Sequence, residues 1–349
     1  MADVKVQSSE ALAPPPPRPV RPVVVWSVAG AGALVLQFYV FASWLSTDAA
    51  PVIATGVPRS TWVFVIVFQV AMTSAAVFAL CYVGRGVIRE RRVTIEAALL
   101  IGYASCFWQD PITPNYLRVT FYYSSAFVNQ GSWGHHIPGW ISPNSSVWVE
   151  PFFLTGSSYL AMILTAIQGR NAMRWIKRRR PQTNVAGLLF TGWLVVASTD
   201  FLLENLFVRT GVYAFPGTIH GLSISGGTIH QVPVYESMTW GLVWATGAAI
   251  LYFVDDRGQS FVEKGIDSFP LGLRHRGLFK ILSCVGVLNL AYIFCFAIPY
   301  NLISLHIDPF PEGYPSHLNN GICGVGTPYA CPDPGLPMNL PNAPVPPPP

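Results

Sequence analysis

Long apolar stretches recur along this chain, and the short segments between them carry most of the charged residues. A helix needs about 20 mostly apolar residues to cross about 30 Å of hydrocarbon. Seven stretches approach that length, so the pattern predicts an all-α fold, a polytopic membrane helix bundle with about seven transmembrane helices. The stretches are Val23–Leu45, Thr61–Val83, Ile95–Phe107, Pro151–Ile167, Val185–Phe207, Met238–Val254 and Leu278–Ile298.

The basic residues of the connecting segments predict how the helices are oriented. Lys and Arg gather before the first stretch, after the second, after the fourth and before the seventh, which places 18 of the 21 on one side. Arg59, Arg118 and Arg209 fall on the other side. Because short positive loops remain in the cytoplasm, we expect the N-terminus inside and the C-terminus outside.

The same pattern divides the chain into three regions. Residues 1–22 are a Pro-rich cytoplasmic tail, residues 23–305 are the transmembrane domain with a long outer loop at 108–150, and residues 306–349 are an outer tail. The outer tail is rich in Pro and Gly and is expected to be largely disordered. Cys323 and Cys331 lie in this tail, on the outer side of the membrane, where conditions are oxidising. We therefore expect them to form a disulfide.

Composition supports a membrane protein and excludes several functions. Hydrophobic residues make up 51% of the chain and charged residues only 11%, against about 25% charged in a soluble domain. The net charge of +4 is small and divided among loops, so nucleic acid is not an expected partner. Phosphate-binding, nucleophile-elbow and zinc-protease signatures are absent, which argues against ATP-driven transport and serine-hydrolase chemistry. We expect no cofactor.

The acidic residues at membrane depth collect at the predicted outer side. Asp110 closes the third stretch, Glu150 and Glu236 open the fourth and sixth, and Asp200 and Glu204 lie in the outer third of the fifth. Such residues cost a few kcal/mol or more in a membrane, which favours a function.

Asp200 and Glu204 are four positions apart, so they share a helix face about 6 Å apart along the axis. If both acids were ionised, their charges would repel each other. We therefore expect one of them to be protonated or paired with a cation. We expect Asp200 and Glu204 to be catalytic, with Glu236 and Asp110 next. The alternative is an interfacial position open to water, with Glu204 paired to Arg209.

Six of the seven histidines also fall on the outer side. His135 and His136 are neighbours that cannot face one way on a regular element, so we predict no metal site. His220 and His230, in a Gly-rich loop, are expected near the substrate as hydrogen-bond partners or proton shuttles.

Outer aromatic residues give a second set of candidate binding residues. Trp108, Tyr213 and Tyr235 are expected to line a pocket and stabilise a transient cation on the substrate, with Arg209 nearby. The alternative is that these aromatics form an interfacial belt at the lipid surface.

These residues stand in four short motifs. The motifs are Trp108-Gln109-Asp110-Pro111 with Asn115-Tyr116, Asp200-Phe-Leu-Leu-Glu204, Arg209-Thr-Gly211-Val-Tyr213-Ala-Phe-Pro216-Gly217 and Val232-Pro-Val-Tyr235-Glu236. With them the chain resembles the AveC-type spirocyclase family of bacterial membrane proteins, and the likeness extends from about Val23 to the end of the seventh stretch. The resemblance implies closure of a hydroxylated ketone chain to a spiroketal in secondary metabolism, in some members with loss of water. It also implies a multi-pass protein of the bacterial inner membrane. A fainter similarity to membrane carotenoid cyclases concerns acidic helix ends and a Pro-x-x-Glu run.

The expected function is therefore acid–base ring closure of a lipid-soluble hydroxyketone inside the bilayer, with protein partners undetermined. A non-catalytic lipid-binding or transport protein is the main alternative. Inverted repeats would be expected of a transporter, and the sequence shows none. A third possible function is that of a structural subunit in a membrane complex.

The division of basic residues predicts a topology that reporter fusions test directly. A fusion after Arg180 should report from the cytoplasm, and a fusion after Pro349 should report as exported. Two signals from the same side would contradict the predicted helix count.

Overall fold

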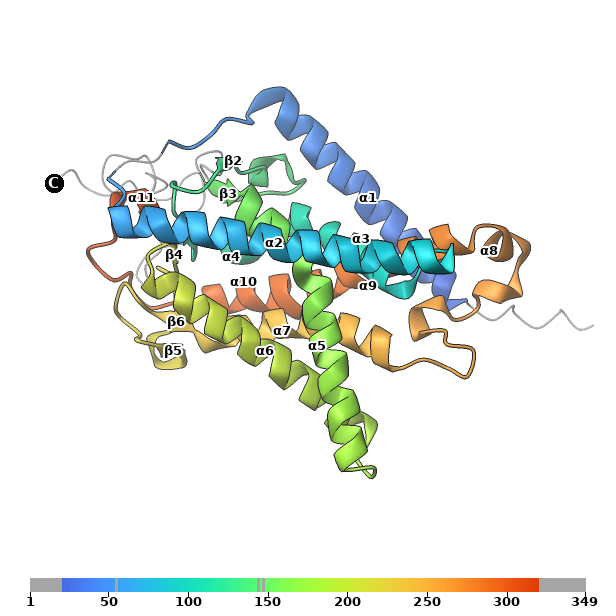
Figure 1. Ribbon diagram of the computed structural model, residues 1–349. Helices are drawn as coiled ribbons and strands as arrows, with labels where there is room; N and C mark the ends of the chain where they lie inside the picture. The colour runs from blue at the N-terminus through green and yellow to red at the C-terminus, as the bar shows by residue number, and fades with distance from the viewer. Residues whose placement is uncertain (1–20, 54–55, 143–144, 146–147, 320–349) are drawn as a thin grey trace, which may run out of the picture.

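Five long helical segments frame the molecule in the computed structural model, which describes residues 21–53, 56–142, 145 and 148–319 (Figure 1). Their length and apolar composition are sufficient to cross a membrane, which indicates a mostly helical membrane protein. Two of the five contain a π-helical turn. The segments are α1 (Pro22–Thr47), α2 (Arg59–Glu90), η4 (Phe152–Gly156) with α5 (Ser157–Arg179), α6 (Val185–Arg209), and α9 (Arg276–Ala291) with η8 (Tyr292–Ala297) and α10 (Ile298–Ser304).

The other two predicted spans also form helices, but shorter ones. Helix α3 covers only Ile95–Ala104, a rise of about 15 Å against the roughly 30 Å of a hydrocarbon core. Helix α7 covers Val234–Tyr252, and more than half of its residues are buried among the other helices. The count of about seven spans and the orientation of the termini therefore stay predictions.

Short strands tie the loops between the helices together. Three antiparallel pairs form, β1 with β4, β2 with β3 and β5 with β6. In Figure 1, β4, β5, β6 and α11 lie at one end of the long helices and α8 lies at the other. The short elements are η1 (Phe107–Gln109), α4 (Ile112–Asn115), β1 (Tyr122–Tyr123), β2 (Asn129–Gly131), η2 (Gly134–His136), β3 (Val149–Pro151), β4 (Tyr213–Ala214), η5 (His220–Leu222), β5 (Ser223–Ile224), β6 (Val232–Pro233), η6 (Phe261–Glu263), η7 (Ile266–Ser268), α8 (Pro270–Arg274) and α11 (Ser316–Asn319).

The outward faces of α1 and α2 carry large apolar side chains. Val35 and Phe38 on α1 are 71% and 77% exposed, and Phe78 on α2 is 61% exposed. Soluble proteins rarely leave such faces uncovered in water. These faces are what lipid contact requires of a spanning helix.

Glycine allows α1 and α9 to cross with their backbones in contact. A Cβ atom at Gly30 would lie 2.0 Å from the carbonyl oxygen of Leu282, and one at Gly286 would lie 2.0 Å from that of Trp26. Small residues at such crossings let backbones approach closely, which strengthens packing where no hydrophobic effect operates.

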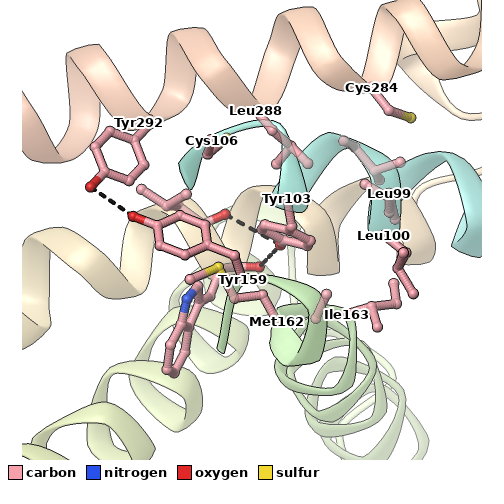
Figure 2. Packing of buried hydrophobic residues seen from close by; sticks show 14 of the residues in the cluster. Leu99, Leu100, Tyr103, Cys106, Tyr159, Met162, Ile163, Cys284, Leu288 and Tyr292 are labelled. Carbon is pink, nitrogen blue, oxygen red and sulfur yellow. Dashed lines mark hydrogen bonds between the residues drawn. The ribbon is translucent and has the colours of Figure 1, made fainter. Parts of the chain in front are cut away.

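A buried tyrosine joins α3 to α7 in a similar way. The Tyr103 hydroxyl donates to the backbone oxygen of Trp244 at 3.1 Å, and it occupies the space beside Gly247 where a Cβ would stand. Figure 2 shows Tyr103 in the core near Leu99 and Leu288. This contact fixes α3 against the helix that carries Glu236.

Residues 306–319, the described part of the predicted outer tail, fold back on the outer loop. The Ser125 amide donates to the His317 carbonyl oxygen at 2.8 Å, and Ser124 Oγ lies 3.0 Å from His317 Nδ1. This part of the tail is therefore packed against the loop. Cys323 and Cys331, with their expected disulfide, lie outside the described residues.

The α1–α9 crossing predicts opposite effects for two neighbouring glycines. Gly30→Ala should destabilise by about 1–3 kcal/mol because the new methyl group meets the α9 backbone. Gly32→Ala is the matched control: nothing lies within 4 Å of its Cβ position, so helix propensity alone should stabilise by up to about 1 kcal/mol. Apparent melting temperatures of the detergent-purified proteins measure both effects. Equal shifts would contradict the close crossing.

Candidate functional site

One internal cavity of about 140 Å³ brings together all four carboxyls that the sequence marked as catalytic candidates. Asp110, Asp200, Glu204 and Glu236 line it, although they lie up to 126 positions apart in the chain. They come from the turn after η1, from α6 and from the first turn of α7. Only the packing of these elements places the four side chains in one cavity.

Three of these carboxyls form a tight group. One oxygen of Asp200, one of Glu204 and one of Glu236 all lie within 4.8 Å of one another. Asp200 and Glu236 are only 3% and 7% exposed. None of the ion pairs among the described residues includes any of the three. Because three close carboxylates repel, the group must hold protons or bind a cation.

Local sequence explains why these carboxyls meet. Pro233 precedes α7 and lets the helix begin at Val234, so Glu236 stands in the first turn, where the helix dipole favours a negative charge. One turn and a half further on, Gly241 packs against Ala197 of α6, with only 2.7 Å from its missing Cβ to the Ala197 Cβ. This close approach brings Glu236 up to Asp200.

The turn after α6 returns the chain over the acids. Gly211 adopts a left-handed backbone with φ of +70°, the conformation that ends many helices and that glycine adopts without strain. Strand β4 follows at once and places Tyr213 on the cavity wall. The Tyr213 hydroxyl faces Glu204 and interacts with it. Of the predicted binding residues, Tyr213 is the one that lines the cavity.

Asp110 connects to a chain of tyrosine hydroxyls. Tyr159 donates to Asp110 Oδ1 at 2.8 Å, and its oxygen lies 3.0 Å from the Tyr292 hydroxyl. Figure 2 shows Tyr159 and Tyr292 pointing toward one another from α5 and η8. Since Tyr159 donates to Asp110, Tyr292 donates to Tyr159, which makes a continuous chain of hydrogen bonds from Tyr292 to Asp110.

Glu150, in β3, lies against Asp110, and the two carboxyls interact directly. Burial raises the pKa of Asp110 to about 6, although contacts with Tyr159 and Glu150 oppose the shift. Burial and repulsion by Asp110 raise the pKa of Glu150 well above its usual value. Burial and mutual repulsion therefore favour a proton shared by this pair of carboxyls.

An amide network holds the turn that carries Asp110. Trp108 Nε1 and Gln109 Nε2 both donate to Asn289 Oδ1, at 3.0 and 2.7 Å. Trp133 Nε1 donates to the Trp108 carbonyl oxygen at 2.7 Å. Trp108, expected to bind substrate, thus lies outside the cavity lining and anchors the turn.

The other predicted binding residues also lie away from the cavity lining. Tyr235 packs against Tyr300 with ring centroids 5.8 Å apart, and the His220 amide donates to Asp308 Oδ2 at 2.6 Å. His230 and Arg209 are exposed. The described ion pairs do not join Arg209 to Glu204. A role in binding for these four residues stays a prediction.

Aromatic side chains form most of the remaining wall, and the sequence singled out only Tyr213 among the candidate binding residues. Trp240 packs on Phe296 at 4.6 Å and on Tyr292 at 5.2 Å between ring centroids. Each lies in an apolar helix, where an aromatic residue is typical of a core. A tyrosine hydroxyl at membrane depth is the one signal that could have pointed to them, because it needs a polar partner. The aromatic residues of the wall are Phe121, Tyr123, Tyr159, Phe207, Tyr213, Phe215, Trp240, Trp244, Tyr292, Phe296 and Tyr300.

Both π-helical turns contribute to this cavity. Leu154 and Thr155 come from η4, and Tyr292 and Phe296 come from η8. A π-helical turn rotates the side chains that follow it, and such turns are frequent at functional sites. Among the polar atoms of the lining that have no hydrogen-bond partner in the described residues are Asp200 Oδ2, Glu204 Oε2 and Trp244 Nε1. A polar ligand in the cavity can satisfy them.

The structure corrects the argument made for His135 and His136. Both rings turn their Nε2 atoms to Asp48 Oδ2, at 2.5 and 3.0 Å. The premise that sequence neighbours cannot face one way is wrong here because they lie on the short 3₁₀ turn η2, not on a regular α-helix or strand. The described residues thus contain two groups with metal-ligand spacing, this one and Asp200 with Glu204 and Glu236.

Fold and cavity together define a helical membrane protein with buried acid groups facing an aromatic-walled chamber. The chain belongs to the AveC-like spirocyclase family: the family model described as "Spirocyclase AveC-like" matches residues 90–319, about two thirds of the chain. No curated protein and no solved structure matches it. The match includes all four carboxyls of the cavity and supports a cyclase-like function.

The raised pKa of Glu150 predicts how stability depends on pH. An acid that holds its proton more tightly in the folded state favours folding below its unfolded pKa, and this advantage is lost as pH rises toward the folded pKa. The stability of the wild-type protein should therefore fall as pH rises above about 4.5, the ordinary pKa of a glutamic acid, by up to about 1.4 kcal/mol per pH unit. Its apparent melting temperature should fall in parallel. Glu150→Gln, which mimics the protonated acid, should flatten that fall. Parallel curves for the two proteins would contradict the assignment.

Proposed function

We propose that this protein is a membrane-embedded cyclase that closes a ring in a lipid-soluble hydroxyketone by acid–base catalysis. The proposal rests on the group of three carboxyls in the aromatic-walled cavity. Their oxygens lie within 4.8 Å of one another, and none has a basic partner among the described residues. Membership of the spirocyclase family supports the same chemistry. The substrate class follows from the apolar lining.

The first step forms one carbon–oxygen bond. A protonated carboxyl donates its proton to the ketone oxygen while a neighbouring carboxylate removes the proton of the attacking hydroxyl. The product is a cyclic hemiketal, and the two carboxyls have exchanged roles. Asp200 and Glu204 are the proposed pair because each has an oxygen in the cavity lining without a partner among the described residues.

The second step removes water and closes the second ring. The carboxyl that gained a proton returns it to the hemiketal hydroxyl, water departs, and an oxocarbenium ion remains. A nearby carboxylate stabilises such an ion, as in glycosidases, and the Trp240 face adds a cation–π contact. A second hydroxyl then attacks and gives up its proton, which completes a spiroketal. Glu236 and Asp110 are the further proton acceptors in the cavity.

The cavity volume limits what can lie inside. About 140 Å³ is less than the roughly 300–1,000 Å³ of usual ligand pockets. The cavity therefore fits the reacting carbons, and the remainder of a long apolar substrate extends between helices toward lipid. Met72 of α2 contributes to the lining, and α2 exposes apolar residues on its outward face. We place the enzyme in the bacterial inner membrane as a multi-pass protein.

The alternative is a non-catalytic lipid-binding or transport protein. Its one structural support is the same group of three acids, whose oxygens are close enough to share a cation. A transport protein releases its ligand unchanged, whereas a cyclase releases an isomer or a dehydrated product. The mass and retention of the released compound therefore separate the two functions.

Isosteric substitutions test the proposed acid–base pair. Asp200→Asn and Glu204→Gln keep side-chain volume but remove proton transfer, which is worth about 10²–10⁴ in rate. Each should lower product per molecule by that factor at near-normal membrane abundance. The measurement is mass spectrometry of lipid extracts from a deletion strain complemented with each variant, normalised to protein level.

Glu96→Gln is the matched control, because Glu96 is a helix-terminal acid of α3 that does not line the cavity. It should retain full activity per molecule. Full activity in both Asp200→Asn and Glu204→Gln would refute the pair. Identical extracts from deletion and wild-type strains would refute the cyclase itself.

A further inference from the structure

A second polar cluster lies on the surface, apart from the carboxyl cavity. Asp48 follows the last turn of α1, and His135 and His136 come from η2 in the outer loop, 87 and 88 positions away. The Asp48 oxygen and the two Nε2 atoms all lie within 4.8 Å of one another. None of the three residues lines the cavity.

The remaining ring nitrogens are also held by hydroxyl groups. His135 Nδ1 lies 2.9 Å from Ser145 Oγ, and His136 Nδ1 lies 2.8 Å from Ser43 Oγ. Metal-binding histidines nearly always donate the second ring N–H to such an outer partner, which fixes the tautomer and aims the free nitrogen. Here each serine orients its histidine ring so that the Nε2 atom faces Asp48 Oδ2.

The surroundings suit an ion that enters from water. Asp48 and His135 have side chains 40% and 37% exposed, whereas the His136 side chain is only 9% exposed. The cluster is thus partly open to water, and one of its two imidazole rings is nearly covered. Three protein ligands with one open position is the arrangement of many zinc sites.

We propose that Asp48, His135 and His136 bind one divalent transition-metal ion of the zinc class. Two imidazoles and one carboxylate favour Zn²⁺ over Ca²⁺ or Mg²⁺, which prefer all-oxygen ligands. The ion ties the end of α1 to the outer loop. Because Trp133 also donates to the Trp108 carbonyl oxygen, the site braces the turn that carries Asp110. This inference is independent of the cyclase proposal.

A metal-free arrangement uses the same atoms and is the competing explanation. Both Nε2–H groups then donate to the Asp48 carboxylate, and the two serine hydroxyls donate to Nδ1. A carboxylate can accept several such bonds. The experiment therefore has to detect the ion itself.

The test uses the full chain, purified in detergent without a polyhistidine tag. After EDTA treatment and desalting, ZnCl₂ is added, excess is removed, and zinc per chain is measured by elemental mass spectrometry. About one zinc per chain is expected, with an apparent melting temperature raised by several degrees. Substoichiometric zinc, or a melting temperature that ZnCl₂ does not change, would overturn the proposal.

Variants locate the ion. His136→Ala and Asp48→Asn should each lower zinc affinity at least about tenfold and remove the thermal shift. The amide introduced by Asp48→Asn keeps the shape of the side chain and can still accept hydrogen bonds, so a metal-free cluster would largely tolerate that change. His230→Ala is the matched control, an exposed outer histidine outside the cluster. Equal zinc binding by all variants would place the ion elsewhere and refute the site.

Wild-type protein supplies an independent measurement if a variant fails to fold. Co²⁺ in a four-coordinate site gives strong visible d–d absorption, whereas Co²⁺ bound to scattered surface groups does not. Adding CoCl₂ to the EDTA-treated chain should give that absorption, and adding ZnCl₂ should then abolish it. No such absorption would count against the site.

Discussion

Repulsion among buried carboxyls is the constraint on which this structure depends. Asp200, Glu204 and Glu236 place oxygens within 4.8 Å of one another in an apolar cavity. Such an arrangement is unfavourable unless protons, a cation or a substrate neutralise it. The protein maintains it by rigid packing of α6 on α7, where Gly241 lies against Ala197. The three carboxyls thus remain close together, which lowers the free energy of unfolding, as is common at functional sites.

Much of the rest of the fold serves to hold that arrangement in place. Asn289 accepts from Trp108 and Gln109 and so fixes the turn before Asp110. Tyr103 joins α3 to α7 through a backbone oxygen. Each contact is a hydrogen bond between buried groups, where an unmade bond is costly.

The outer loop is the second element of this organisation. It spans the end of α1 and the turn that carries Asp110, and it is held at several points. Trp44 Nε1 donates to the Gly131 carbonyl oxygen at 2.9 Å, and β2 pairs with β3, the strand that carries Glu150. Long loops in compact proteins usually carry function or close a site. Here the loop supplies both Glu150 and the two histidines that meet Asp48.

The sequence alone determined the helical membrane class, the family resemblance and the four carboxyls, because apolar length and misplaced charge are local properties of a chain. Tertiary structure decided that Asp110 and Glu236 join Asp200 and Glu204, since contacts between distant segments depend on packing that no spacing rule encodes. It also placed Trp108 outside the cavity, where an indole N–H needed an amide partner. Finally, it turned His135 and His136 to one atom of Asp48, because a 3₁₀ turn does not follow the periodicity of regular helices and strands.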